Sequence, residues 1–248
     1  MKKVRLDQRL LELDLVKSKS RAQALIIAGK VLVNDVPVTK CGATVTIEST
    51  IRLKEADHPY VSRGGLKLEK ALLEFKIDVE GKVALDVGAS TGGFTDVLLS
   101  QGAKFVVAVD VGRNQLDWKL RTDDRVLSLE GVNARNLRKE DLPEHLASAI
   151  DVIVVDVSFI SLKLILPALL SFFRESTRAV TLIKPQFEVG RENVGEGGIV
   201  RDDNARQRVI KEIEESALQI GLILKALIES PIKGSKGNVE YLAFWQKA

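Results

Sequence analysis

From Val83 to Trp245, short apolar runs alternate with stretches of helical periodicity. Several of these runs are apolar at every position, as strands buried on both faces of a sheet must be. The alternation predicts an α/β domain built on a doubly wound, mostly parallel sheet of seven strands. The predicted strands are Val83–Val87, Phe105–Val109, Val126–Leu129, Val152–Val155, Ala179–Ile183, Leu222–Ile228 and Glu240–Trp245, and the predicted helices are 93–101, 114–121, 162–174 and 203–220.

Residues 1–57 predict a separate, small α+β module. Leucines at helical spacing indicate a helix over residues 5–14, and a second helix begins at Ser18 or Ser20 and is ended by Gly29. Short strands follow at Val31–Val33, Val36–Val38, Thr44–Ile47 and Ile51–Leu53, the first two joined by an Asn-Asp turn. Residues 58–61 read as a linker stiffened by a proline, and a second domain spans 62–248, opening with a helix to about Glu74.

The positive charge of the chain is concentrated in this module. Residues 1–57 carry 11 Lys and Arg against 7 Asp and Glu, whereas the rest of the chain carries 26 against 27. A basic module suits a polyanionic partner such as RNA, although the same lysines can simply solubilise a small domain. The side chains expected at caps, turns and edges, within reach of phosphates, are Lys17, Lys19, Arg21, Lys30 and Lys40.

The sequence carries no sign of secretion or of membrane insertion. Its one cysteine, Cys41, allows no disulfide within the chain. Charges interrupt the first fifteen residues too often for a signal peptide, and no apolar run approaches the ~20 residues that span a bilayer. We therefore expect a cytoplasmic protein without a membrane partner.

A glycine-rich loop follows the first strand of the predicted sheet and reads Asp86-Val-Gly-Ala-Ser-Thr-Gly-Gly-Phe94. It differs from the Gly-x-Gly-x-x-Gly pattern of dinucleotide sites, and a carboxylate at its start disfavours a phosphate ligand. The loop resembles the first motif of class I methyltransferases, and Asp86 suits the cationic amino group of S-adenosylmethionine. Asp110, at the end of the next strand, can accept from ribose hydroxyls or simply cap the strand. The candidate cofactor residues are Asp86, Gly88, Ser90, Thr91, Gly92, Gly93, Phe94, Asp110 and, toward adenine, Asn133.

Four charged residues lie where the predicted elements would bring them to one edge of the sheet: Lys67, Asp156, Lys184 and Glu240. Taken singly, each is most simply a strand-end ion pair. Together, lysines and carboxylates beside a methyl donor suit a weakly acidic nucleophile such as a ribose 2′-hydroxyl. Lys184 is the candidate base or cation next to that hydroxyl, Asp156 and Glu240 fix its charge, and Lys67 orients the ribose.

Other chemistries fit less well. Methylation of exocyclic amines usually uses a Pro-Pro-aromatic segment, where this chain has Asp156-Val-Ser-Phe. Methylation of pyrimidine carbon 5 needs a cysteine nucleophile, and Cys41 lies in the other predicted domain. The two histidines, His58 and His145, belong to no cluster with metal-ligand spacing, so we expect no metal site.

Two resemblances extend this interpretation. Residues 3–57, with Arg5-Leu-Asp-Gln-Arg-Leu and Gly29-Lys-Val-Leu-Val-Asn, resemble the RNA-binding module named after ribosomal protein S4. Nearly the whole chain resembles the TlyA family of hemolysin-A-like proteins, which are similar to FtsJ-type ribosomal RNA methyltransferases. Its motifs here are Ser62-Arg-Gly-Gly-Leu-Lys, Gly88-Ala-Ser-Thr-Gly-Gly-Phe, Asp156-Val-Ser-Phe-Ile-Ser-Leu, Lys184-Pro-Gln-Phe-Glu-Val-Gly and Gly237-Asn-Val-Glu-Tyr.

The resemblance to the TlyA family implies a Lys–Asp–Lys–Glu tetrad, S-adenosylmethionine, and 2′-O-methylation of cytidine in ribosomal RNA or ribosomal subunits. It also adds Arg5 and Arg63 to the candidate RNA contacts. Two alternatives stay open: a membrane-active protein, as the hemolysin label suggests, and a non-catalytic RNA-binding assembly factor. The glycine-rich connection 185–201 is either a lid that orders on RNA or a flexible loop.

Overall fold

The computed structural model describes residues 3–54, 58–190, 193–234 and 236–248. The chain divides into two compact units, Met1–Pro59 and Tyr60–Ala248. The boundary predicted at residue 57 lies outside the described residues, and the last two residues of the predicted linker belong to the second unit.

The first unit packs two helices against short antiparallel strands. Two strands form one sheet, and three form another in the order β3-β2-β5. Its core includes Leu6 and Leu10 from one helix and Leu25 and Ile26 from the other. The elements are β1 Lys3–Arg5, α1 Leu6–Glu12, α2 Lys19–Ile27, β2 Val31–Val33, β3 Val36–Val38, β4 Thr44–Thr46 and β5 Ile51–Leu53.

Strand β1 was not predicted, because nothing in its three residues distinguishes it from the start of a helix. It is a strand only because it pairs with β4, some forty residues further along the chain. The helix predicted from residue 5 therefore begins at Leu6.

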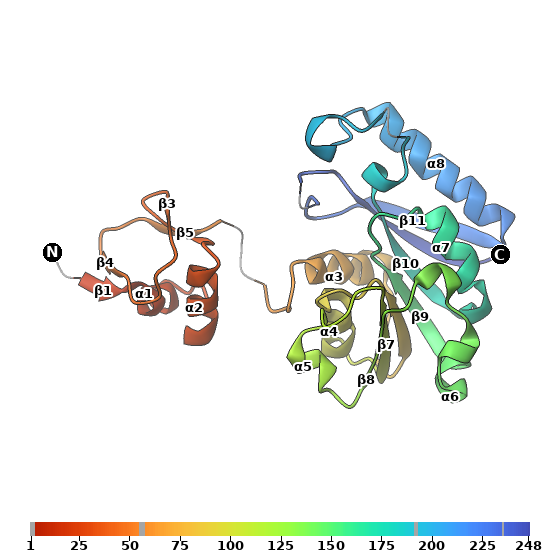
Figure 1. Ribbon diagram of the computed structural model, residues 1–248, viewed down its shortest axis with the longest axis horizontal. Helices are drawn as coiled ribbons and strands as arrows, with labels where there is room; N and C mark the ends of the chain where they lie inside the picture. Colours follow the sequence, from red (N-terminus) through yellow and green to blue (C-terminus); the bar gives the residue numbers. More distant parts are fainter. Residues whose placement is uncertain (1–2, 55–57, 191–192, 235) are drawn as a thin grey trace. The chain divides into compact units, whose positions relative to one another are not determined.

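The second unit is the predicted doubly wound sheet, and Figure 1 shows helices on both of its faces. Its seven strands lie in the order β11-β12-β10-β9-β6-β7-β8, with β12 antiparallel to both of its neighbours and the remaining pairs parallel. The strands are β6 Val83–Val87, β7 Phe105–Asp110, β8 Val126–Glu130, β9 Ile150–Val155, β10 Arg178–Ile183, β11 Leu222–Glu229 and β12 Tyr241–Lys247. The helices are α3 Gly64–Phe75, α4 Gly93–Ser100, α5 Trp118–Arg121, α6 Glu144–Ala147, α7 Leu162–Leu169 and α8 Asp203–Gln219.

Alternate residues of the central strands enter two separate cores. Leu85 of β6 and Ile153 of β9 belong to the core beneath α7 and α8, whereas Ala84 and Val154 belong to the core beneath α3 and α4. Both faces of the sheet are therefore buried, which explains why these strands are apolar at almost every position.

Two predicted helices are shorter than expected. The helix predicted at 114–121 begins only at Trp118, because Asp117 caps it by accepting from the backbone N–H of Lys119. The helix predicted at 162–174 ends at Leu169 and continues as a short 3₁₀ turn. The helix α6 was not predicted.

The chain order reverses between β6 and β9, where ligands of doubly wound proteins bind beyond the carboxyl ends of the strands. Gly88 turns the chain there with a φ of +86°, and a Cβ on it would lie 2.6 Å from the carbonyl oxygen of Asp156. The two strand ends approach so closely that only glycine fits at this position.

We predict that the hydrogen bond between Trp245 and Thr181 anchors β12 in the sheet. The indole N–H donates to the Thr181 hydroxyl across 2.9 Å, and both side chains are fully buried. Thr181→Val leaves that N–H without an acceptor and should cost about 1–3 kcal/mol of unfolding free energy. Urea unfolding measures the loss, and Thr122→Val, which removes an exposed hydroxyl, is the control. Equal midpoints for the two variants would contradict the prediction.

Candidate active site

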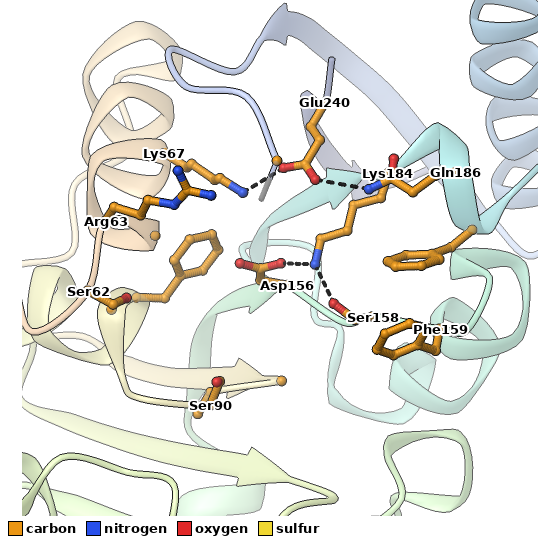
Figure 2. Close-up of a pocket in the computed structure, with 17 residues that line it drawn as sticks. Ser62, Arg63, Lys67, Ser90, Asp156, Ser158, Phe159, Lys184, Gln186 and Glu240 are labelled. Carbon is orange, nitrogen blue, oxygen red and sulfur yellow. Dashed lines mark hydrogen bonds and ion pairs between the residues drawn. The ribbon is translucent and has the colours of Figure 1, made fainter. Parts of the chain in front are cut away.

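The four predicted charged residues meet in one place as two ion pairs. Lys67 Nζ lies 2.6 Å from Glu240 Oε2, and Lys184 Nζ lies 2.6 Å from Asp156 Oδ1. Figure 2 shows the two lysines entering from opposite sides, with the two carboxylates between them. We call this group the tetrad.

Each tetrad member comes from the edge of the sheet at which the chain order reverses. Asp156 follows β9, Lys184 follows β10, and Glu240 immediately precedes the antiparallel β12. Lys67 lies on the first turn of α3, whose neighbouring residues pack into the core. Parallel strands end at the same edge, and an antiparallel strand begins there, so the topology alone gathers these side chains.

The tetrad is buried and electrically balanced. The side chains of Lys67 and Glu240 are 9% and 3% exposed, and those of Lys184 and Asp156 are 11% and 21% exposed. Charges removed from water this far need partners, and each ammonium here has a carboxylate.

Two neutral side chains complete the polar contacts. Lys184 Nζ also donates to Ser158 Oγ across 2.8 Å, and Gln186 Nε2 donates to Glu240 Oε1 across 3.2 Å. Both carboxylate oxygens of Glu240 are therefore engaged, one by a lysine and one by an amide. The contacts hold Lys184 from two sides and leave part of its ammonium facing the adjoining cavity.

The tetrad forms one wall of a cavity of about 430 Å³. Every tetrad member lines it, together with part of the glycine-rich loop and an aromatic pair. Its lining residues include Ser62, Arg63, Lys67, Gly88, Ser90, Gly93, Phe94, Asp156, Ser158, Phe159, Lys184, Gln186, Phe187 and Glu240.

A second cavity, of about 550 Å³, adjoins the first. Gly88, Ser90, Asp156, Ser158 and Phe159 line both cavities. The residues found only in the second include Asp110, Val111, Gln115, Asn133, Ala134 and Ile165. One ligand can thus lie beside the glycine-rich loop while another reaches the tetrad.

The carboxylate of Asp110 is held by backbone amides. Ser90 N donates to Asp110 Oδ2 across 2.7 Å, and Gly112 N donates to Oδ1 across 2.6 Å. These bonds tie the glycine-rich loop to the end of β7. Of the nine predicted cofactor residues, six line one cavity or both, and Asp86, Thr91 and Gly92 line neither.

Asp86 lies behind the glycine-rich loop. Its side chain is fully buried, and Thr95 Oγ1 donates to its Oδ2 across 2.6 Å. Burial raises the pKa of Asp86 to about 7, against the opposing effect of the Thr95 hydrogen bond. Direct contact between Asp86 and a cofactor amino group stays a prediction.

The predicted RNA contacts fall in both units. Lys17, Lys19, Arg21 and Lys30 lie around the ends of α2 in the first unit, and Arg5 ends β1. Lys17 is paired with Asp14, and Ser18 caps α2 by accepting from the backbone of Arg21. Arg63 belongs to the second unit and lines the first cavity.

Sequence reasoning missed an aromatic pair at the cavity. Phe159 and Phe187 have ring centroids 4.9 Å apart, and Phe159 is 89% exposed with a φ of +64°. A bulky residue in the left-handed region is strained, as often happens at binding sites. The motif Asp156-Val-Ser-Phe contained the signal, but we had used it only to exclude amine methylation.

Glu188 fastens the two loops that carry this pair. Its Oε2 accepts from Ser161 Oγ across 2.5 Å, and its Oε1 accepts from the backbone N–H of Leu162 across 2.8 Å. The contact caps α7 and joins the loop after β10 to the loop after β9. Burial raises the pKa of Glu188.

Within the described ranges, no group of three or more His, Cys, Asp or Glu side chains is arranged to hold a metal ion. The same residues contain no helix that is both long enough and apolar enough to cross a membrane.

The sheet order, the glycine-rich turn and the tetrad define a class I methyltransferase domain. Residues 60–247 match the model of the FtsJ-like methyltransferases, and residues 4–51 match that of the S4 domain. The chain belongs to the TlyA family of FtsJ-like methyltransferases.

Several relatives match over almost the full chain. Hemolysin A of Brachyspira hyodysenteriae is 48% identical, covering 97% of this chain and 98% of the relative. The 16S/23S rRNA (cytidine-2′-O)-methyltransferase TlyA of Mycobacterium tuberculosis is 43% identical, covering 97% of this chain and 88% of the relative. A solved structure from Streptococcus thermophilus, named provisionally as a hemolysin, is 44% identical with a TM-score of 0.77, covering 100% of this chain and 90% of that one.

We predict that Asp86 makes the stability of the fold depend on pH. An unfolded aspartate titrates near ~3.9, whereas in the fold the pKa is about 7. Between these values the folded state binds more protons, so unfolding free energy falls as pH rises from about 4 to 7. Asp86→Asn keeps the shape and the Thr95 contact but removes the titration.

The measurement is urea unfolding of both proteins from pH 4.5 to pH 7. Relative to Asp86→Asn, the unmodified protein should lose up to about 1 kcal/mol of unfolding free energy per pH unit. Taking the difference between the two proteins removes the effect of groups that they share. Parallel pH profiles would show that Asp86 titrates normally.

Proposed function

We propose that this protein transfers a methyl group from S-adenosylmethionine to the ribose 2′-hydroxyl of a cytidine in ribosomal RNA. The observation that carries the proposal is the position of the tetrad: two buried ion pairs form the wall of one cavity, and a second cavity adjoins it along the glycine-rich loop. A ribosomal substrate implies that the protein acts in the cytoplasm.

The second cavity fits the cofactor. The amide-held carboxylate of Asp110 provides an acceptor for ribose hydroxyls, and the exposed Asn133 lies where an adenine contact is expected. Gly88 leaves open the space that a side chain would fill between the loop and Asp156. When bound, S-adenosylmethionine supplies an electrophilic methyl group.

The first cavity fits the nucleotide that accepts the methyl group. A ribose hydroxyl is a weak acid, so its proton must be stabilised or removed as the new bond forms. Lys184 performs this task, as a hydrogen-bond donor to the oxygen or as the acceptor of its proton. Asp156 and Ser158 fix the position of the lysine.

The second ion pair orients the substrate. Lys67 and Glu240 form a rigid polar surface on the other side of the cavity, and Gln186 holds the free oxygen of Glu240. Arg63 also lines this cavity and supplies a cation for a phosphate of the RNA.

Ribosomal RNA as substrate is supported by two further observations. An S4 domain precedes the methyltransferase domain, and the relative from Mycobacterium tuberculosis is named as a 16S/23S rRNA cytidine-2′-O-methyltransferase. Capture of structured RNA through phosphates and shape brings the target to the cavity, and the target nucleotide must leave its stack to enter it.

We predict that Lys184→Ala binds S-adenosylmethionine normally but transfers the methyl group at least about a hundredfold more slowly. Lys184 lines the first cavity and not the second, so the two effects should separate. The assay is transfer of tritiated methyl onto unmodified ribosomal subunits, followed by mapping of the labelled nucleotide, with cofactor affinity measured by calorimetry.

The matched control is Lys211→Ala, which removes an exposed lysine from α8. This variant should methylate at the rate of the unmodified protein. Full activity of Lys184→Ala would remove that residue from the mechanism, and label on a base rather than on a ribose would refute the 2′-hydroxyl as acceptor.

The hemolysin name of one relative motivates a competing test. The proposed function predicts no release of dye from liposomes at concentrations that fully methylate the RNA. Leakage retained by Lys184→Ala would indicate a membrane activity independent of the tetrad. RNA binding without any methyl transfer would favour the non-catalytic assembly factor.

A further inference from the structure

A buried carboxylate lies beneath an arginine on the surface of the first unit. Arg5 donates from Nε to Asp7 Oδ1 across 3.0 Å and from Nη2 to Asp7 Oδ2 across 2.8 Å. The Arg5 side chain is 49% exposed, whereas Asp7 is fully buried. The two parallel bonds fix the plane of the guanidinium, which a flexible surface arginine would not have.

Two further donors hold the carboxylate itself. Gln23 Nε2, from α2, donates to Asp7 Oδ2 across 3.0 Å, and the backbone N–H of Gln8 donates to Oδ1 across 2.9 Å. Hydrogen bonding to Arg5 holds the pKa of Asp7 well below its usual range, so the carboxylate is ionised at neutral pH. Asp7 is thereby fixed to both helices of the unit.

The geometry leaves one edge of the guanidinium available. An arginine has five N–H donors, and two of them are directed at Asp7. The remaining donors lie on Nη1 and Nη2, and no described residue accepts from Nη1. This edge can bind two oxygens of one phosphate at once, which a lysine cannot do.

The charges of the pair cancel, so its attraction for a distant polyanion is small. What Asp7 provides is orientation, because a guanidinium held in one plane loses less freedom on binding than a mobile one. Orientation and net charge therefore predict opposite effects of neutralising Asp7.

We propose that Asp7 is a positioning residue that presents Arg5 as a preformed fork for a backbone phosphate of the RNA substrate. The inference rests on the proposed function, since it assumes that the first unit binds RNA. It concerns capture of the RNA and leaves the methyl-transfer chemistry unchanged.

The test uses the full chain and a fluorescently labelled, unmethylated ribosomal RNA transcript. Asp7→Asn adds one positive charge to the protein yet should weaken binding about tenfold, because Arg5 loses its fixed orientation. Glu48→Gln adds the same charge at an exposed position and should bind as tightly as the unmodified protein or more so.

A double-mutant cycle separates positioning from folding. In an Arg5→Ala background, Asp7→Asn should have no further effect on RNA affinity, whereas damage to the fold would persist. Urea midpoints of each variant establish that binding is measured on folded protein. Arg5→Lys keeps the charge and tests the fork without touching Asp7; it should lose nearly as much affinity as Arg5→Ala.

Three results would overturn the inference: unchanged or tighter binding by Asp7→Asn, an equal loss in the Arg5→Ala background, or full affinity of Arg5→Lys. If Asp7→Asn does not fold, the result with Arg5→Lys decides. Failure of the unmodified protein to bind the transcript would refute the proposed function as well, so the two failures can be told apart.

Discussion

The site depends on the mutual neutralisation of two ammonium groups and two carboxylates at one edge of the sheet. Removing any of these charges from water alone would be costly, and only the pairing makes their burial tolerable. The pairing in turn requires the ends of β9 and β10, the start of β12 and the first turn of α3 to lie together. The fold and the site are therefore two aspects of the same arrangement.

The two cavities share a wall in which Gly88 meets the backbone of Asp156. A cofactor in one and a nucleotide in the other would approach each other across residues from two adjacent strands. The register of β6 against β9 sets this spacing, with Val87 paired to Val155 immediately before the two residues that touch. Reactant distance is thus a property of sheet pairing, and side-chain flexibility contributes little to it.

Much of this could be predicted because it follows from local pattern. Apolar runs located the central strands, and the rule that ligands meet strand ends brought Asp156, Lys184 and Glu240 together. What failed depends on distant contacts or on backbone conformation. Strand β1 exists only through pairing with β4, Asp86 lies behind its loop, and the left-handed conformation of Phe159 leaves no trace in sequence periodicity. The sequence likewise could not show which carboxylate pairs with which lysine.

The antiparallel direction of β12 has a practical consequence. Because this strand begins at Glu240, it carries the chain away from the reaction centre and delivers its last residues to the opposite edge of the sheet. At roughly 3.3 Å per residue, a strand of this length spans more than about 20 Å. Attachment of the enzyme to a surface through its final residue should therefore leave the mouth of the site open to a substrate as large as a ribosomal subunit.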